Sequence, residues 1–203
     1  MNFSKNRKKI IAFIAAFLFL GITFFLLSGK LETIDNIVTN YILSIRNPNL
    51  TTIMIIITNI CSLIGLLIIS TFIFLFIKNK KFIYYIIINL MNSLLLSFLF
   101  KNLIRRQRPI EINLIEVSGF SYPSGHSIVS MAFFGLLAYL VYKSYTNKAT
   151  KITLISTLLL ITILIGFSRI YLGVHYFSDV LGGFLISTSY LMFFIITTKL
   201  YKH

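Results

Sequence analysis

Six long runs of apolar residues constrain this 203-residue chain more than any other feature. They cover approximately residues 10–27, 52–77, 82–100, 128–142, 152–167 and 180–198. An α-helix of about 20 apolar residues crosses a hydrocarbon core of about 30 Å, and the shorter fourth and fifth runs can still span if flanking Tyr and Lys side chains reach the interface. Only 12% of the residues are charged, too few for a soluble domain of this size. The sequence therefore predicts an all-α membrane protein in which residues 1–203 form one domain of six transmembrane helices.

The placement of the basic residues predicts the orientation of the chain in the membrane. If the N-terminus is cytoplasmic, the inner segments 5–9, 78–81, 143–151 and 199–202 hold most of the 19 Lys and Arg residues and none of the five acidic ones. Short loops rich in Lys and Arg stay in the cytoplasm, so both termini are predicted to be cytoplasmic. The net charge of +14 is thereby explained without a nucleic-acid partner.

The predicted outer segments differ from the short basic inner ones. Residues 28–51 carry apolar side chains at helical spacing, which predicts an extracytoplasmic amphipathic helix over residues 31–45. Residues 101–127 and 168–179 hold both non-terminal histidines. A transporter would place ionisable groups near the middle of its spans, whereas these apolar runs contain none. The chemistry is therefore predicted to lie at the outer membrane–water boundary.

The first polar cluster is KNLIRRQRP, which begins at Lys101. Arg108 follows Lys101 by seven residues, close to two helical turns, so both side chains are predicted to point to one side before Pro109 ends the helix. An Arg fork and a Lys point charge suit phosphate oxygens. For Arg105 and Arg106 the favoured interpretation is a basic collar that touches anionic lipid headgroups.

The second cluster is YPSGHS, at the start of the fourth apolar run. Pro123 suits the start of a helix, and Gly125 lets a backbone N–H approach a ligand without an intervening Cβ. The free amides of a helix N-terminus make a ready anion site, to which Ser124 adds a hydroxyl donor. His126 lies beside this site, where a proton donor is useful; the alternative is an interfacial amphipathic side chain.

The third cluster is SRIYLGVHYFSD, which closes the fifth run and leads into the sixth. His175 and Asp179 are spaced i, i+4, so on a helix Asp179 accepts a hydrogen bond from one imidazole nitrogen and leaves the other free to attack. Arg169 adds a third cation; the alternative for the His–Asp pair is a surface ion pair. Together the three clusters describe an oxyanion cradle with a nucleophile and a proton donor, the inventory that phosphoryl transfer needs.

A metal mechanism is not favoured by the remaining acidic residues. A two-metal phosphatase needs several carboxylates at ligand distances. Glu32, Asp35, Glu111 and Glu116 form no HxxE or DxD arrangement and are predicted to decorate loops. Neither a metal nor another cofactor is expected.

The spacings K-x6-RP, PSGH and SR-x5-H-x3-D resemble the three-part signature of the type 2 phosphatidic acid phosphatase (PAP2) superfamily. The match has no departure over residues 100–183, and the order of motifs, the length and the span count are similar to those of its small bacterial membrane members. The resemblance implies a PAP2-type helical bundle with a motif-bearing core over about residues 82–198.

The same resemblance implies a metal-independent lipid phosphatase with a phosphohistidine intermediate. His175 would attack phosphorus with Asp179 orienting it, and His126 would protonate the leaving oxygen. The phosphate oxygens would be held by Lys101, Arg108, Ser124, Gly125 and Arg169. The role of Ser168 is left open, with helix-end capping as its alternative.

The expected substrate is a membrane lipid with a phosphate or pyrophosphate headgroup. Undecaprenyl pyrophosphate, phosphatidylglycerol phosphate and phosphatidic acid are the candidates, and the amphipathic helix over 31–45 would cover the entrance for them. A phosphotransferase acting on an acceptor other than water is the alternative reaction. Haloperoxidase relatives are soluble, which argues against that chemistry, and a phosphate-recognising transporter or scaffold would not need the acid–nucleophile pair.

Overall fold

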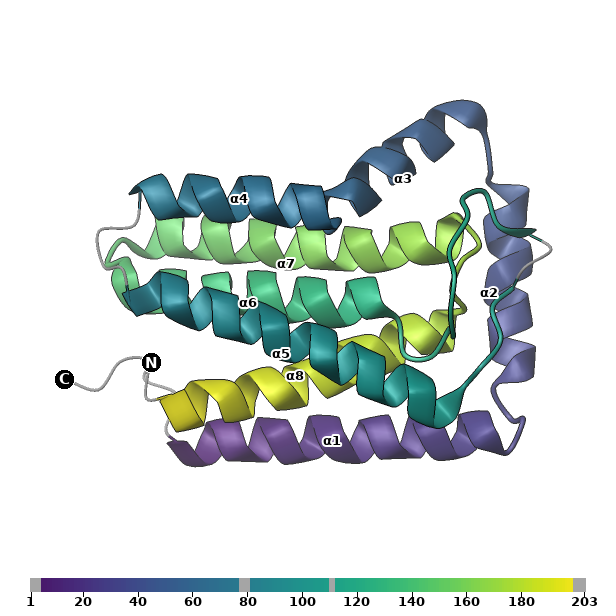
Figure 1. Ribbon diagram of the computed structural model, residues 1–203, viewed down its shortest axis with the longest axis horizontal. Helices are drawn as coiled ribbons and strands as arrows, with labels where there is room; N and C mark the ends of the chain where they lie inside the picture. Colours follow the sequence, from purple (N-terminus) through teal and green to yellow (C-terminus); the bar gives the residue numbers. More distant parts are fainter. Residues whose placement is uncertain (1–4, 77–80, 110–111, 199–203) are drawn as a thin grey trace.

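The computed structural model describes residues 5–76, 81–109 and 112–198, and this part of the chain forms eight α-helices without a strand (Figure 1). The helices are α1 (Lys5–Leu27), α2 (Glu32–Ser44), α3 (Pro48–Ile60), α4 (Leu63–Phe76), α5 (Lys81–Ile104), α6 (Gly125–Ser144), α7 (Lys148–Tyr171) and α8 (Phe177–Thr198). Helices α1, α5, α6, α7 and α8 are each long and apolar enough to cross a membrane, and the bent pair α3 and α4 is a sixth candidate if it counts as one span. The predicted all-α membrane fold is confirmed, and five to six candidate spans agree with the predicted number.

The long helices lie side by side, and both α1 and α8 have their chain-terminal ends at the same end of the bundle (Figure 1). The connections from α5 to α6 and from α7 to α8 lie at the opposite end, where α2 runs across the bundle. Helix α6 contacts α5, α7 and α8, so it occupies the centre. The three polar clusters therefore meet at one end of the bundle. The basic segments 78–80 and 199–202 lie outside the described residues.

The run over 52–77, predicted as one continuous helix, is broken at Cys61 and Ser62, and its two halves are bent by 56°. The Asn59 carbonyl accepts hydrogen bonds from the Ser62 backbone and hydroxyl instead of continuing the helix. A Cβ on Gly65 would lie 2.3 Å from that carbonyl, so only glycine permits so close an approach. The break carries Thr58 and Cys61 toward α6 and α7.

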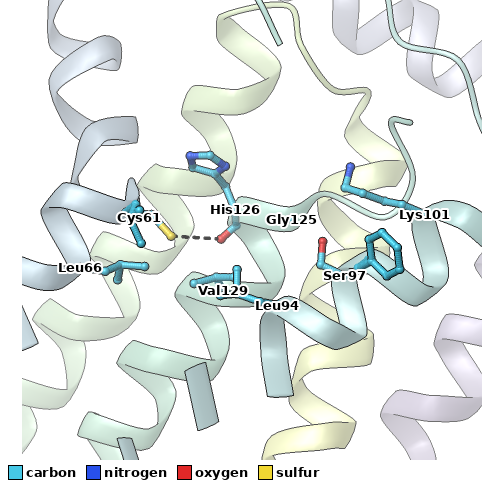
Figure 2. A pocket seen from close by; sticks show the side chains of 10 residues that line it. Cys61, Leu66, Leu94, Ser97, Lys101, Gly125, His126 and Val129 are labelled. Atoms are coloured by element: carbon cyan, nitrogen blue, oxygen red, sulfur yellow. Dashed lines mark hydrogen bonds between the residues drawn. The ribbon is translucent and has the colours of Figure 1, made fainter. Parts of the chain in front are cut away.

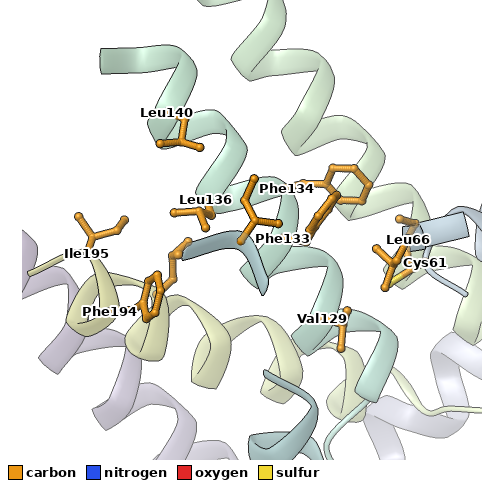
Figure 3. Packing of buried hydrophobic residues seen from close by; sticks show 12 residues of the cluster. Cys61, Leu66, Val129, Phe133, Phe134, Leu136, Leu140, Phe194 and Ile195 are labelled. Atoms are coloured by element: carbon orange, nitrogen blue, oxygen red, sulfur yellow. The ribbon is translucent and has the colours of Figure 1, made fainter. Parts of the chain in front are cut away.

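The main packing core is built around α6 (Figure 3). Phe133 and Leu136 of α6 pack with Ile165 of α7 and Phe194 of α8, all of them buried. Between transmembrane helices such contacts stabilise through close packing and dispersion, because lipid tails are as apolar as the side chains themselves. This core holds α6, α7 and α8 together, and each of these helices carries candidate site residues at one of its ends.

Helix α2 confirms the predicted helical segment over 31–45, with one unexpected side chain. Ile34, Ile37 and Tyr41 are exposed, whereas Ile42 is buried against α3 and α7. Asp35 is also fully buried, although it was expected to decorate a loop. That expectation was wrong, because Asp35 has a charged partner in the loop after α5 and a polar partner in α8.

Candidate active site

The structure gathers the predicted site residues at the end of the bundle that α2 crosses. Lys101 lies in the last turn of α5, Arg169 in the last turn of α7 and Asp179 in the first turn of α8. The remaining members lie at or near the helix ends: Arg108 in the loop after α5, Ser124, Gly125 and His126 at the start of α6, and His175 in the turn before α8.

The predicted helical link between Lys101 and Arg108 is wrong. Helix α5 ends at Ile104, and Arg105 adopts a φ of 54°, in the left-handed region that stops a helix. Arg108 therefore lies in an irregular loop, and Pro109 does not end the helix. The two cations are brought together by tertiary contacts and not by helical periodicity.

Both cations are held by the chain that leads into α6. Arg108 donates to the carbonyls of Gly119, Phe120 and Val174 at 2.7 to 3.1 Å. Lys101 donates through Nζ to the Phe120 carbonyl at 2.5 Å. Because these bonds hold the guanidinium and ammonium groups themselves, the positive charges are positioned before any anion arrives.

His175 makes different contacts through its two ring nitrogens. Nδ1 lies 3.4 Å from Oδ2 of Asp179 and 3.3 Å from Oγ of Ser121, while Nε2 lies 3.1 Å from Nη1 of Arg108. Arginine can only donate, so Nε2 is the acceptor and carries the lone pair, and the proton of the neutral ring belongs to Nδ1. His175 precedes α8, whose first residue is Phe177, so the pairing with Asp179 occurs at a helix start and not within a helical face.

The electrostatic surroundings keep His175 neutral. Burial of the imidazole lowers the pKa of His175 to about 3, against the opposing influence of the Asp179 carboxylate. At pH 7 the ring therefore keeps an unprotonated Nε2, whose lone pair accepts from Arg108. A neutral imidazole with an oriented nitrogen is the form that a nucleophile requires.

The N-terminus of α6 faces the same region. Ser124 is the N-cap, and its hydroxyl accepts a hydrogen bond from the Ser127 backbone at 3.4 Å. A Cβ on Gly125 would lie 3.0 Å from Oγ of Ser97, so glycine allows α5 to pack against this helix end. His126 is partly exposed, and it lines the same cavity as Lys101 and Gly125. The first turn of α6 is thus available to an anion.

Arg169 is buried at the end of α7 with donor capacity to spare. Nη1 donates to Oγ1 of Thr58 at 2.7 Å, whereas Nε is buried with no hydrogen-bond partner in the part of the chain that the structure describes. An unsatisfied guanidinium donor is costly to bury, which suggests that an anion completes it. The neighbouring Ser168 hydroxyl donates to the Ile165 carbonyl at 2.6 Å. This contact agrees with the alternative role of Ser168, the capping of carbonyl groups near the end of a helix.

Sequence reasoning missed three residues of this network. Ser121 donates a short hydrogen bond to Oδ2 of Asp179, and Arg106 binds Oδ1 of Asp179 at 2.6 Å and Asp35 at 2.7 Å. Arg106 was interpreted as part of a basic collar for lipid headgroups, and that is wrong because its guanidinium is committed to the two carboxylates. No local signal separates Arg106 from its neighbour Arg105.

The other acidic residues lie away from this network. Glu32 and Glu116 are exposed, and Glu111 lies outside the described residues. Among the residues that the structure does describe, no three His, Cys, Asp or Glu side chains gather as a metal-binding group.

A cavity of about 380 Å³ adjoins the cluster (Figure 2). Figure 2 shows His126 and Lys101 on one side of it and Leu66, Leu94 and Val129 on the other. Its remaining lining is Cys61, Leu63, Ser97, Phe98 and Gly125. The rim residues Leu63, Leu94 and Phe98 are exposed on the side of the bundle, where a membrane-spanning protein meets lipid tails. Since α2 contributes no residue to this lining in the described chain, the expected role of α2 as a cover for the entrance is not supported.

Comparison with known proteins places this arrangement in a family. The model of the PAP2 superfamily matches residues 61–201, which contain all three motifs. The chain belongs to the PAP2 superfamily. It is 40% identical over 104 residues to phosphatidylglycerophosphatase B of Bacillus subtilis (strain 168), a match that spans half of each chain.

Two crystal structures share the fold. One is the structure of a transmembrane PAP2-type phosphatidylglycerolphosphate phosphatase from Bacillus subtilis. It superposes with a TM-score of 0.84 at 28% identity, over 94% of this chain and 98% of that one. LpxE of Aquifex aeolicus gives a TM-score of 0.64 and 26% identity, over 79% of this chain and 92% of that one. The PAP2 architecture therefore extends beyond the motif region and over nearly the whole chain.

Proposed function

We propose that this protein is a lipid phosphatase that hydrolyses phosphate or pyrophosphate monoesters through a phosphohistidine on His175. The observation that carries the proposal is the placement of Nε2 of His175, which bears a lone pair and faces the Arg108 guanidinium. A phosphate held by Arg108 would bring its phosphorus to that nitrogen. Membership of the PAP2 superfamily and similarity to phosphatidylglycerolphosphate phosphatases of Bacillus subtilis support the same reaction class.

In the first step a bond forms between Nε2 and phosphorus as the bond from phosphorus to the lipid oxygen breaks. His126 gives its proton to the departing oxygen, and Asp179 stabilises the charge that develops on His175. In the second step His126 takes a proton from water, whose oxygen attacks phosphorus and releases His175. Lys101, Arg108, Arg169 and the first turn of α6 with Ser124 and Gly125 bind the equatorial oxygens in both steps.

The cavity beside the cluster supports a lipid as the substrate. Its polar end holds His126 and Lys101, and its apolar end opens through Leu94 and Phe98 on the side of the bundle. A headgroup at the polar end would leave its tail in the hydrocarbon region. We propose phosphatidylglycerol phosphate as the preferred substrate, because the relatives are named for it; undecaprenyl pyrophosphate and phosphatidic acid are the competitors.

The proposed orientation puts the site on the extracytoplasmic face with both termini in the cytoplasm. The site lies at the end of the bundle opposite the start of α1 and the end of α8 (Figure 1). Lys5 and Lys9 at that far end, together with Lys148 and Lys151, agree with a cytoplasmic location under the positive-inside rule.

Purified protein in detergent micelles tests the activity. With EDTA present, we expect phosphate release from all three lipids, fastest from phosphatidylglycerol phosphate, because the oxyanion is neutralised by side-chain cations and helix amides. Free phosphate and the dephosphorylated lipid are both measured. Product in which the phosphate has moved to an added acceptor lipid would indicate the phosphotransferase alternative, and complete loss of turnover in EDTA would contradict the metal-independent reaction.

A bulky residue at the cavity rim tests the route of the lipid tail. We expect Leu94→Trp to lower kcat/KM for a long-chain lipid phosphate, since overfilling a packed apolar site costs roughly 1–3 kcal/mol. A short-chain analogue with the same headgroup would be hydrolysed as before. The matched control is Leu95→Trp, a similarly exposed neighbour on α5 that does not line the cavity. Equal effects of the two variants on the long-chain substrate would contradict this route.

A further inference from the structure

Asp35 is a charged residue buried on a helix that otherwise lies at the surface of the bundle. Its carboxylate accepts hydrogen bonds from the Ser178 backbone at 2.9 Å and the Ser178 hydroxyl at 2.6 Å, and it pairs with Arg106 at 2.7 Å. Burying a carboxylate is costly unless it is paired and hydrogen-bonded, and Asp35 meets both conditions. The partners of Asp35 lie more than 70 positions away in the sequence, in the loop after α5 and at the start of α8.

Arg106 joins Asp35 to the proposed catalytic pair. Its Nη2 binds Asp35, its Nη1 binds Oδ1 of Asp179 at 2.6 Å, and its plane stacks on the Tyr176 ring at 4.1 Å. A guanidinium that bridges two carboxylates fixes their separation and their orientation, because its donors form a rigid planar fork.

The two carboxylate oxygens of Asp179 have separate partners. Oδ1 is bound by Arg106, while Oδ2 accepts from the Tyr176 backbone at 2.8 Å, from Ser121 and from Nδ1 of His175. Rotation of the carboxylate away from this position would break the Arg106 contact. Arg106 therefore holds Oδ2 in the position that orients the His175 ring.

We propose that Arg106, anchored by Asp35 of α2, is a positioning residue for the Asp179–His175 pair. Arg106 acts through Asp179 and does not touch the phosphate. The proposal rests on the proposed phosphatase function. It gives α2 an indirect part in the chemistry, because this helix supplies the Asp35 carboxylate that binds Arg106.

Arg106→Gln tests the proposal, with Arg105→Gln as the matched control. Both variants remove one positive charge from the same loop, but Arg105 is exposed and its Nε donates only to the Asn102 carbonyl in its own helix turn. We expect kcat of Arg106→Gln to fall about 100-fold, the cost of a small misplacement of reacting groups, with KM nearly unchanged. Arg105→Gln should keep the wild-type kcat. Equal kcat values for the two variants, or a rise in KM alone, would overturn the proposal.

Two further variants keep the test decisive if Arg106→Gln fails to fold. Arg106→Lys retains the charge, yet an ammonium cannot bridge two carboxylates as a fork, so kcat should still fall; a wild-type kcat would overturn the proposal. Asp35→Asn should lower kcat, and adding it to Arg106→Lys should cause little further loss, because both changes disrupt one unit. Independent losses that multiply, or a lower melting temperature with an unchanged kcat, would also overturn it.

The control separates this inference from the proposed function. If the wild-type protein and Arg105→Gln release no phosphate from any lipid, the phosphatase function itself fails. If both are active and Arg106→Gln matches them, only the positioning role is lost.

Discussion

His175→Ala is expected to lower kcat for lipid phosphate hydrolysis by more than roughly 10⁴-fold, the scale of loss when the nucleophile of a catalytic unit is removed. The reason is that the substitution removes the one nitrogen that carries a lone pair toward the Arg108 guanidinium. Phosphate release is measured at saturating lipid in detergent, with the melting temperature of each variant as a check on folding. Turnover close to the wild-type rate would exclude His175 as the nucleophile.

His126→Ala is the matched control, because it removes the other imidazole of the proposed mechanism. With an activated ester whose leaving group needs no proton, the first step should proceed in this variant while hydrolysis of the intermediate slows. Phosphate bound to the protein, stable in base and labile in acid, should therefore accumulate in His126→Ala and be absent from His175→Ala. Accumulation in both variants would place the covalent bond on another residue.

Asp179→Asn is expected to lower kcat by roughly 10²–10⁴-fold, as when the orienting aspartate of a triad becomes an amide. The Asn amide group cannot accept from Ser121, the Tyr176 backbone and the His175 ring with the same set of lone pairs. The ion pair with Arg106 is lost as well. KM should change far less than kcat, since Asp179 is buried behind His175.

Asp35→Asn provides the comparison for Asp179→Asn. It removes a carboxylate from the same network but leaves every contact of His175 in place. Its effect on kcat should be the smaller of the two, while both variants lose an ion pair with Arg106 and are destabilised. A larger loss of kcat in Asp35→Asn than in Asp179→Asn would contradict the proposal that Asp35 acts through Arg106 on Asp179.

Hydropathy determined most of the helical architecture, because the preference of a 20-residue apolar run for the membrane is a local property. It did not reveal the break at Cys61 and Ser62, because the short polar stretch TNICS has long apolar runs on both sides. The hydrogen bonds from Ser62 to the Asn59 carbonyl and the close approach of Gly65 to the same carbonyl accompany that bend. The consequence is functional, since the break brings Thr58 to Arg169 and Cys61 to the cavity.

The candidate site likewise combines features that the sequence predicted with features that only the tertiary structure decided. The sequence by itself predicted a set of candidate catalytic and phosphate-binding residues, because histidines, cations and a helix N-terminus near the ends of apolar runs are visible as local patterns. Tertiary structure alone decided that Arg108 reaches His175 from a loop and that Arg106, not Arg105, joins Asp35 to Asp179. Hydrogen bonds between segments some 70 residues apart depend on how the helices pack, and two adjacent arginines look alike until the fold buries one of them.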